Sequence, residues 1–196
     1  MATIQNTTVT PTKLELLTEW LPAQPWYVAH AGAPDLVKGG GFRLDDPRGE
    51  VGIEFLVVVD RAAPEPVAYL VPLGYRGVAL DGAGREALVG TCEHGVLGTR
   101  WVYDGAHDPV VSAQLRELLD GRAVPQHQNE SDTPDPTVRL HGTATATDGT
   151  GTRPVEIQRV LRPAEVDEAA PRHLVAGWTR PDGTPARGVF ATTGRE

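Results

Sequence analysis

Near the start of this 196-residue chain, apolar residues recur at the spacing of a helix. They lie three to four residues apart and form one stripe: Leu14, Leu17 and Leu21. Thr12 and Glu15 have the spacing of a capping box, in which each side chain bonds a backbone N–H that the first turn leaves free. The pattern predicts a short helix that begins after Thr12 and ends at Pro22, whose ring cannot continue the hydrogen-bond ladder.

From residue 26 onward the apolar positions form short runs separated by turn residues, which predicts strands. These runs span residues 26–29, 37–44, 51–59, 67–73, 88–92 and 99–103. In the run at 51–59 one face is apolar throughout and the other is apolar in its middle, at Leu56 and Val58, as in a central strand. Residues 93–98 have the composition of a hairpin connection, and the glycines at 39–41 indicate a bulge or a flexible turn.

A second helix has the clearest boundaries in the sequence. Asp108 is a favoured N-cap residue, Pro109 suits the first helical position, and Gly121 is a typical stop. The expected buried stripe of this helix comprises Val111, Leu115 and Leu118, with Leu119 beside it. Together with the strands, the two helices predict an α+β fold for residues 1–122.

Residues 123–136 are polar, contain several prolines and lack periodicity, so we expect a linker or a long surface loop there. Over residues 137–196 the spacing is again that of strands. Val138, Leu140, Gly142, Ala144 and Ala146 share one face, and Val155, Ile157 and Leu161 line another. The pairs Asp148-Gly149 and Asp182-Gly183 suit hairpin turns. Because so few large apolar residues make a marginal core, we expect these antiparallel strands to pack on residues 1–122 as an extension.

The formal net charge of -8, from 26 acidic and 18 basic residues, would repel a phosphate backbone or an anionic lipid surface. We therefore expect neither a nucleic acid nor a membrane as a partner. The start of the chain has no basic and apolar leader, and no stretch approaches the roughly 20 apolar residues that span a bilayer. The single cysteine, Cys92, rules out an intrachain disulfide, and these features together indicate a cytoplasmic protein.

One group of side chains has the types needed for catalysis or metal binding: Cys92, His94, Asp104, His107 and Asp108. A thiol, an imidazole and a carboxylate can act as nucleophile, base and orienting group. A structural role is the stronger interpretation, because a lone cysteine is usually a small buried apolar residue and Asp108 already caps a helix. A metal site is the weakest interpretation, since closed zinc sites need four ligands. We expect no bound metal ion.

Two further patterns point to ligands only weakly. Residues 82–87 match the dinucleotide fingerprint G-x-G-x-x-[GA], but the chain continues into a strand-like run where the fingerprint needs a helix. Four tryptophans could form a platform for sugar rings, although tryptophan more often belongs to the core. They are Trp20, Trp26, Trp101 and Trp178.

Several segments resemble the N-terminal cap of maltokinases. Residues 20–27, WLPAQPWY, are similar to the opening of that family, where a Trp-Leu, a Gln and a Trp followed by an aromatic residue lead from the first helix into the first strand. Pro25 stands where the family usually has a basic residue. Residues 69–75, YLVPLGY, resemble the cap strand that carries a Pro-Leu pair. Residues 90–98 and 100–105, GTCEHGVLG and RWVYDG, look still more like short actinobacterial proteins classed as maltokinase cap-like, some of them labelled glucan-branching proteins.

The resemblance covers roughly residues 12–122 and implies a small curved antiparallel sheet with a helix, similar to cystatins. In maltokinases the cap precedes a lobe that transfers phosphate from ATP to maltose. That reaction needs carboxylates for magnesium, a base, and a lysine or loop over the phosphates. We find no His-Gly-Asp catalytic-loop pattern, and the only lysines are Lys13 and Lys38. We therefore expect no catalytic residue and no cofactor.

These features predict a non-catalytic accessory or regulatory protein that binds a protein partner or a glucan in maltose, trehalose or glycogen metabolism. One alternative is a sensor of a sugar or sugar phosphate, with its ligand between the N-terminal sheet and the C-terminal strands. The other is an enzyme that uses Cys92, His94 and His107. The residues expected to contact a ligand are Glu93, His94, Arg100, Trp101, Asp104 and His107.

Overall fold

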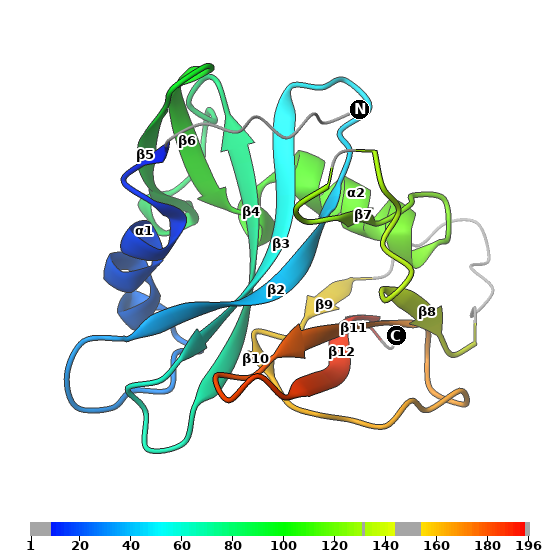
Figure 1. The fold of residues 1–196 in the computed structure, drawn as a ribbon. Coiled ribbons are helices and arrows are strands. Elements are labelled where there is room, and N and C mark those ends of the chain that lie inside the picture. The colour runs from blue at the N-terminus through cyan, green and yellow to red at the C-terminus, as the bar shows by residue number, and fades with distance from the viewer. Residues whose placement is uncertain (1–8, 131, 144–153, 195–196) are drawn as a thin grey trace.

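The chain folds into two antiparallel sheets and two α-helices, as a computed structural model of residues 9–130, 132–143 and 154–194 shows (Figure 1). The larger sheet has the strand order β1-β5-β6-β4-β3-β2-β7, with β10 paired to β4, and the smaller sheet has the order β8-β11-β12-β9. The elements are β1 (Val9–Thr10), α1 (Lys13–Trp20), β2 (Leu36–Leu44), β3 (Val51–Asp60), β4 (Val67–Arg76), β5 (Leu88–His94), β6 (Gly98–Asp104), α2 (Pro109–Leu119), β7 (Gln126–His127), β8 (Arg139–His141), β9 (Val155–Ile157), β10 (Val160–Leu161), β11 (His173–Thr179) and β12 (Pro185–Thr193). The α+β fold with a curved antiparallel sheet and further C-terminal strands is confirmed.

The larger sheet is covered on both faces, and β3 is one of its interior strands. Phe55 and Val57 of β3 pack into one core with α2 and the smaller sheet, whereas Leu56 and Val58 pack into a second core with α1. β3 pairs with β2 on one side and with β4 on the other along most of its length. The two-sided apolar pattern of this run therefore predicted its position correctly.

Glu54, a carboxylate on the α1 side of β3, is buried and collects hydrogen bonds from three parts of the chain. Lys13 of α1 lies 2.6 Å away, the Tyr75 hydroxyl of β4 lies 2.8 Å away, and Gln128 donates from 2.8 Å. Burial by itself would raise the pKa of Glu54, but the Lys13 charge and these hydrogen bonds outweigh it and lower the pKa. The buried charge thus fastens α1, β4 and the segment after β7 to β3.

The start of α1 has the predicted capping box. The Thr12 backbone N–H donates to Glu15 at 2.7 Å, and the Glu15 backbone N–H donates to the Thr12 hydroxyl at 3.3 Å. Leu17 and Leu21 are fully buried, as the apolar stripe predicted, and a 3₁₀ turn at Leu21–Ala23 follows the helix.

The glycines of β2 form the predicted bulge. The register with β3 shifts between Lys38 and Gly40, and Gly40 and Gly41 have φ values of 127° and 129°. A Cβ atom at Gly41 would overlap the carbonyl oxygen of Phe55 on β3. Glycine is therefore required here for close approach as well as for backbone conformation.

The prediction of a strand at residues 26–29 is wrong, because these residues form turns and a loop. Backbone hydrogen bonds from Gln24 to Leu21 and from Tyr27 to Gln24 fold this region into turns. The rings of Trp26 and Tyr27 then pack on Tyr69 of β4, with centroid distances of 5.9 and 5.7 Å. A loop laid on a sheet buries aromatic residues as well as a strand does, so the composition of the run was misleading.

β4 extends three residues beyond the predicted run and carries Pro72 inside it. On the edge away from β3, β4 pairs with β10 at Ala68 and Tyr69 and with β6 only from Leu73 onward. Leu70 donates its backbone N–H toward this edge, to Arg159. The missing N–H of Pro72, two residues on, therefore falls in the gap between two partner strands, where it costs no ladder bond.

The segment 123–136, expected to be a linker or a long surface loop, contributes one short strand to the larger sheet. Gln126 and His127 form β7 and pair with Arg43 and Phe42 of β2, and Gln128 is buried. Beyond it, the smaller sheet packs on the α2 face of the larger one, and β10 joins the larger sheet directly. The C-terminal strands therefore pack on the first part of the chain, as expected.

Of the two Asp-Gly pairs expected to form hairpin turns, the structure describes one. Asp182-Gly183 lies in the connection between β11 and β12, and Gly183 has φ +83°. Ala144, Ala146 and the Asp148-Gly149 pair lie outside the described residues, and β8 is described over Arg139–His141 only.

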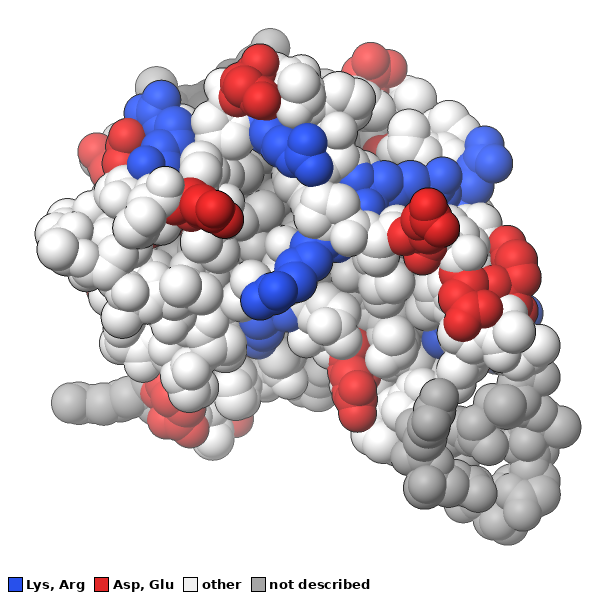
Figure 2. Space-filling view, turned by 90° about the horizontal axis from the view of Figure 1, so that it is seen from below, with Lys and Arg blue, Asp and Glu red and all other residues white. Residues whose placement is uncertain are grey.

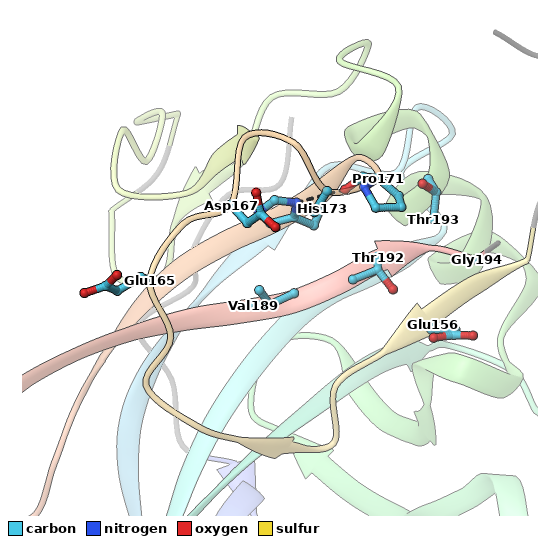
Figure 3. A pocket seen from close by; sticks show the side chains of 10 residues that line it. Glu156, Glu165, Asp167, Pro171, His173, Val189, Thr192, Thr193 and Gly194 are labelled. Atoms are coloured by element: carbon cyan, nitrogen blue, oxygen red, sulfur yellow. Dashed lines mark hydrogen bonds between the residues drawn. The ribbon is translucent and has the colours of Figure 1, made fainter. Parts of the chain in front are cut away.

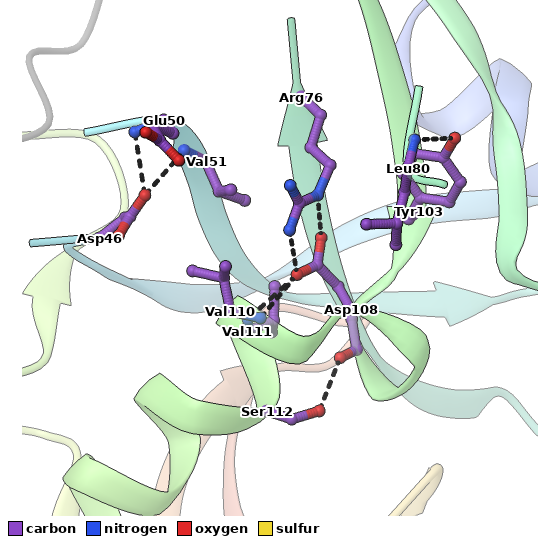
Figure 4. A network of polar contacts seen from close by, with 11 residues as sticks. Asp46, Glu50, Val51, Arg76, Leu80, Tyr103, Asp108, Val110, Val111 and Ser112 are labelled. Atoms are coloured by element: carbon purple, nitrogen blue, oxygen red, sulfur yellow. Dashed lines mark hydrogen bonds and ion pairs between the residues drawn. The ribbon is translucent and has the colours of Figure 1, made fainter. Parts of the chain in front are cut away.

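Asp108 joins α2 to β4 as a buried N-cap (Figure 4). Its carboxylate accepts from the backbone N–H groups of Val110 and Val111 at 2.9 and 3.4 Å. The same carboxylate takes two hydrogen bonds from the Arg76 guanidinium at 2.6 and 2.8 Å. The hydrogen bond to Asp108 is the largest cause of the raised pKa of Arg76. This ion pair fixes the helix on the sheet.

We expect Asp108→Ala to lower the free energy of unfolding by about 3–5 kcal/mol, because it removes a helix cap and leaves Arg76 without its buried partner. Urea denaturation of the purified protein measures this change. Asp81→Ala, at an exposed loop position, serves as the control and should stay within about 0.5 kcal/mol of the unchanged protein. An Asp108→Ala variant as stable as that control would contradict the role assigned to the ion pair.

Candidate functional site

A cavity of about 400 Å³ lies on the outer face of the smaller sheet (Figure 3). On this sheet Leu174 and Ala191 point into the core shared with the larger sheet, so their neighbours His173 and Thr192 point away from it. The segment between β10 and β11 crosses over this outer face and carries part of the lining. The lining residues are Glu156, Glu165, Asp167, Ala170, Pro171, His173, Val189, Thr192, Thr193 and Gly194.

A row of polar side chains runs across the four strands at one level. The register places His141 of β8 opposite His173 of β11, His173 opposite Thr192 of β12, and Thr192 opposite Glu156 of β9. Directly opposed residues share a face of the sheet, so these four side chains form one line. The rings of His141 and His173 stack with their centroids 6.0 Å apart.

Glu168 fastens the crossing segment to the sheet. Its carboxylate lies 2.7 Å from His141 Nδ1 and accepts the backbone N–H of Gly142 at 3.2 Å. The hydrogen bond from His141, followed by that from Gly142, lowers the pKa of Glu168. The segment that covers the cavity is thereby held at a defined position.

The polar groups of the cavity are mainly hydrogen-bond acceptors. His173 Nδ1 lies 2.9 Å from the Pro171 carbonyl oxygen, which can only accept, so Nδ1 carries a proton and donates it to this oxygen. Among the residues that the structure describes, Nε2 has no partner, and the carboxylates of Glu156 and Glu165 have none either. No lysine or arginine is among the described lining residues.

The six residues expected to bind a ligand do not form one site. Most of them lie along the β5–β6 hairpin, which would separate His94 at the turn from Asp104 at the far end of β6 by about 20 Å at the usual rise per residue. Glu93 and Trp101 point to one face of the hairpin, whereas Arg100 points to the other with its register partner Cys92. The prediction grouped these residues because they are close in sequence, but the strands of a hairpin place them at different points along its length.

Several of these side chains already have structural partners. His94 Nδ1 accepts the backbone N–H groups of Val96 and Leu97 at 3.3 and 3.2 Å and so shapes the hairpin turn. Asp104 is 2% exposed and binds Arg159 at 2.6 Å. Glu93 accepts from the Thr99 hydroxyl at 2.6 Å. His107 is half exposed at 50% and lies 4.0 Å from Asp104.

Cys92 is buried in the core on the α1 side, with 4% of its surface exposed. Burial, together with the nearby Glu93 charge, raises the pKa of its thiol. A nucleophilic cysteine needs the opposite environment, because only the thiolate reacts. The geometry therefore supports the structural interpretation of this residue.

The four tryptophans do not make one platform. Trp20 and Trp26 pack edge to face at 5.8 Å on the α1 side of the larger sheet, whereas Trp178 belongs to the core on the opposite side. Trp101 is half-buried on β6. The space between the N-terminal sheet and the C-terminal strands, where a sensor ligand was expected, is filled by the apolar core that contains Phe55 and Trp178. The cavity lies on the far face of the C-terminal sheet.

The face seen in Figure 2 carries acidic and basic side chains interspersed, with no extended basic patch. No helix among the described residues is long and apolar enough to cross a membrane. No group of three or more described His, Cys, Asp or Glu side chains could hold a metal ion.

The fold and its hairpin define an α+β protein with a curved antiparallel sheet. Residues 20–108 match the family model of the maltokinase N-terminal cap domain, and over this segment the chain is maltokinase cap-like. The matched part runs from the last residue of α1 to the N-cap of α2 and includes β2 to β6. The cavity lies outside it. The comparison with curated proteins gave no match to the chain.

The sequence patterns did not predict the cavity residues. His173 has no potential partner close to it along the chain, and Glu156 and Glu165 carry no motif. Residues 155–157 and 173–179 lie on the same sheet because both strands pair with β12. The periodicity of a single strand does not reveal which strands pair.

We expect the Cys92 thiol of the folded protein to react with a disulfide reagent at least about 100-fold more slowly than in the unfolded chain, because it is buried and protonated. Absorbance of the released thiolate follows the reaction, and Cys92→Ser provides the blank. Equal rates in the folded and unfolded states would show that the thiol is accessible and reactive.

Stability should also depend on pH through His30. His30 Nε2 lies 2.8 Å from Asp60, and this hydrogen bond raises the pKa of His30. Its contribution to stability is fully present below the unfolded value of about 6.5 and is lost as pH rises through the higher folded value. The free energy of unfolding should therefore fall above about pH 6.5, and His30→Gln should flatten that decline while His107→Gln, the exposed control, should not. A decline unchanged in His30→Gln would refute the assignment.

Proposed function

We propose that this chain is a non-catalytic accessory or regulatory protein of maltose, trehalose or glycogen metabolism that binds an α-glucan or a protein partner. The similarity of residues 20–108 to the maltokinase cap indicates a maltokinase-related role. One observation carries the non-catalytic part of the proposal. The side chains of the cap-like segment with reactive potential are buried, paired or spread along a hairpin.

The C-terminal strands support the same proposal. Residues 154–194 pack on the cap sheet, and they add neither a phosphate-binding loop nor a clustered set of magnesium ligands within the described residues. Phosphoryl transfer needs both positioning and charge neutralisation around the phosphates. The acidic cavity of the smaller sheet would repel a nucleotide.

The β5–β6 hairpin offers the best surface for a glucan. On one of its faces the half-buried Trp101 pairs with the exposed Thr91. The next pair on this face, toward the hairpin turn, is Glu93 with Thr99. A pyranose ring can stack on a partly exposed indole while the neighbouring hydroxyl and carboxylate groups bond its hydroxyls. Of the six predicted ligand contacts, Glu93 and Trp101 remain in this proposal.

A sensor for a small molecule is the second candidate, and the cavity favours it. Its size is in the range of small-molecule sites, which begin near 300 Å³. The carboxylates in its lining disfavour a sugar phosphate, because they would repel the phosphate dianion.

We expect Trp101→Ala to weaken binding to soluble glycogen or amylose by up to about tenfold through loss of ring stacking. Affinity electrophoresis in gels that contain the polysaccharide measures this change. Val78→Ala, which alters an exposed apolar side chain outside the hairpin, is the matched control. Binding that Trp101→Ala leaves intact would remove the hairpin from the proposal, and transfer of phosphate from ATP to maltose by the purified chain would refute a non-catalytic role.

A further inference from the structure

We propose that residues 29–33 form a flap, which the protonated side chain of His30 holds shut and which opens when this side chain loses its proton. The flap lies between α1 and β2, and its histidine covers the buried carboxylate of Asp60 at the end of β3. The pH dependence of stability attributed above to this pair concerns unfolding of the whole chain. The flap, in contrast, opens while the rest of the chain stays folded.

The flap has a single buried side chain. Ala29 and residues 31–33 are exposed, and a Cβ atom placed on Gly32 would meet nothing within 4 Å. The side chain of His30, in contrast, is only 4% exposed. A segment with so few buried contacts opens at a lower free energy than the core does. The closed position of the flap therefore depends on His30.

Both ends of the flap are fixed by backbone hydrogen bonds. Before it, the Val28 N–H donates to the Tyr69 hydroxyl of β4 at 3.1 Å. After it, the Asp35 N–H donates to the Asp60 carboxylate at 3.0 Å, and the Asp35 carbonyl oxygen accepts the Arg61 N–H at 3.0 Å. Movement is therefore confined to the residues between these two points.

Both ring nitrogens of His30 face acceptors. Nδ1 lies 3.1 Å from the Ala31 carbonyl oxygen, which can only accept, and Nε2 lies 2.8 Å from the Asp60 carboxylate. The Tyr27 hydroxyl, 2.7 Å from Nε2, donates to the same carboxylate oxygen at 3.1 Å. Only the imidazolium can donate from both nitrogens, so the closed flap holds the charged form of the ring.

Loss of the proton on Nε2 replaces an attraction by a repulsion. The lone pair of Nε2 would then face the carboxylate oxygen of Asp60 across 2.8 Å. Asp60 is fully buried, and its other oxygen accepts the backbone N–H groups of Asp35 and Ala62 at 3.0 Å each. Because the carboxylate is held in place, the imidazole is the group that moves. The flap thereby loses its only buried side chain and uncovers Asp60.

The flap opens as pH rises. The hydrogen bond with Asp60 raises the pKa of His30. The contribution of such a group is fully present below the unfolded value of about 6.5 and is lost as pH rises through the higher folded value. Burial alone would raise the pKa of Asp60, but the hydrogen bonds from His30 and from backbone N–H groups outweigh it and lower the pKa. Asp60 therefore stays charged while His30 titrates.

The other titratable and charged groups near the ring do not replace His30 as the switch. Burial, followed by the bond with Asp60, raises the pKa of Tyr27 to about 12. Burial also raises the pKa of Tyr69. Both hydroxyls keep their protons while His30 titrates. The remaining charges are those of Asp35 and Arg61, which form an exposed ion pair at 2.9 Å.

Electron paramagnetic resonance of a nitroxide attached at Ala33→Cys tests the proposal. The protein also carries Cys92→Ala, so that the flap holds its single thiol. Between about pH 6 and about pH 9, the ratio of mobile to immobile label should rise by up to about tenfold per pH unit, the limit for loss of one proton. A ratio that stays constant over this range overturns the proposal.

Two variants in the same background assign the change to one histidine. In His30→Gln the side chain has no proton to lose, so the ratio should no longer depend on pH. His107→Gln alters an exposed histidine and is the matched control, which should keep the pH dependence. The proposal fails if the dependence persists in His30→Gln or disappears in His107→Gln.

A second label distinguishes the flap from the whole fold. Val78 is 72% exposed after β4, and a nitroxide at Val78→Cys should show no change over the same pH range. Parallel changes at both labels would mean general loosening and would overturn the proposal. Should His30→Gln not fold, NMR titration of the His30 ring in the parent protein decides. Its midpoint must coincide with that of the flap label, and separate midpoints refute the assignment.

Discussion

The structure depends on β3, an interior strand of the larger sheet. Both faces of this strand are buried, and the face toward α1 includes two carboxylates. Phe55 and Val57 face the smaller sheet, and Leu56 and Val58 face α1. On the α1 side the apolar pair is flanked by Glu54 and Asp60, both buried. A buried carboxylate is tolerated only when hydrogen bonds replace its lost hydration. Other parts of the chain supply these hydrogen bonds to both carboxylates.

Each of the two carboxylates organises a different region. Glu54 receives bonds from Lys13, Tyr75 and Gln128, and so connects the first helix and the segment after β7 to the middle of the sheet. At the other end, burial alone would raise the pKa of Asp60, but hydrogen bonds from His30 and neighbouring groups lower it. These bonds hold the loop that follows α1, where the aromatic residues of the cap-like opening pack on Tyr69.

The two faces of the larger sheet have different consequences for function. The α1 face is closed by α1 and the loop that follows it, and it leaves Cys92 buried. The opposite face needs cover, and the smaller sheet supplies it with Phe190 and Trp178. Because a sheet has two faces, the side turned away from that core is free to form a hollow, and the acidic cavity lies there. The part of the chain that resembles the cap and the part with the cavity are thus joined by one apolar core.

Local signals in the sequence determined the elements whose pattern is complete within a short segment. The capping box at Thr12, the Asp108-Pro109 helix start and the two-sided pattern of 51–59 each specify their structure through neighbouring residues, and all three are confirmed. The run at 26–29 failed because burial of aromatic rings does not distinguish a strand from a loop packed on a sheet. Within residues 123–136, the short strand Gln126–His127 was not predicted, because its partner β2 lies some 80 residues earlier.

The candidate site shows the same limit more sharply. The sequence grouped residues 92–108 because they are close along the chain, but a hairpin sets its ends far apart. His141, His173, Thr192 and Glu156 are scattered in sequence and become one row only when β8, β11, β12 and β9 pair in register. The sequence by itself thus determined the helices, the interior strand β3 and the resemblance to the cap. Only the tertiary structure decided which polar groups are satisfied and which remain open in a cavity, because that depends on strand pairing between distant segments.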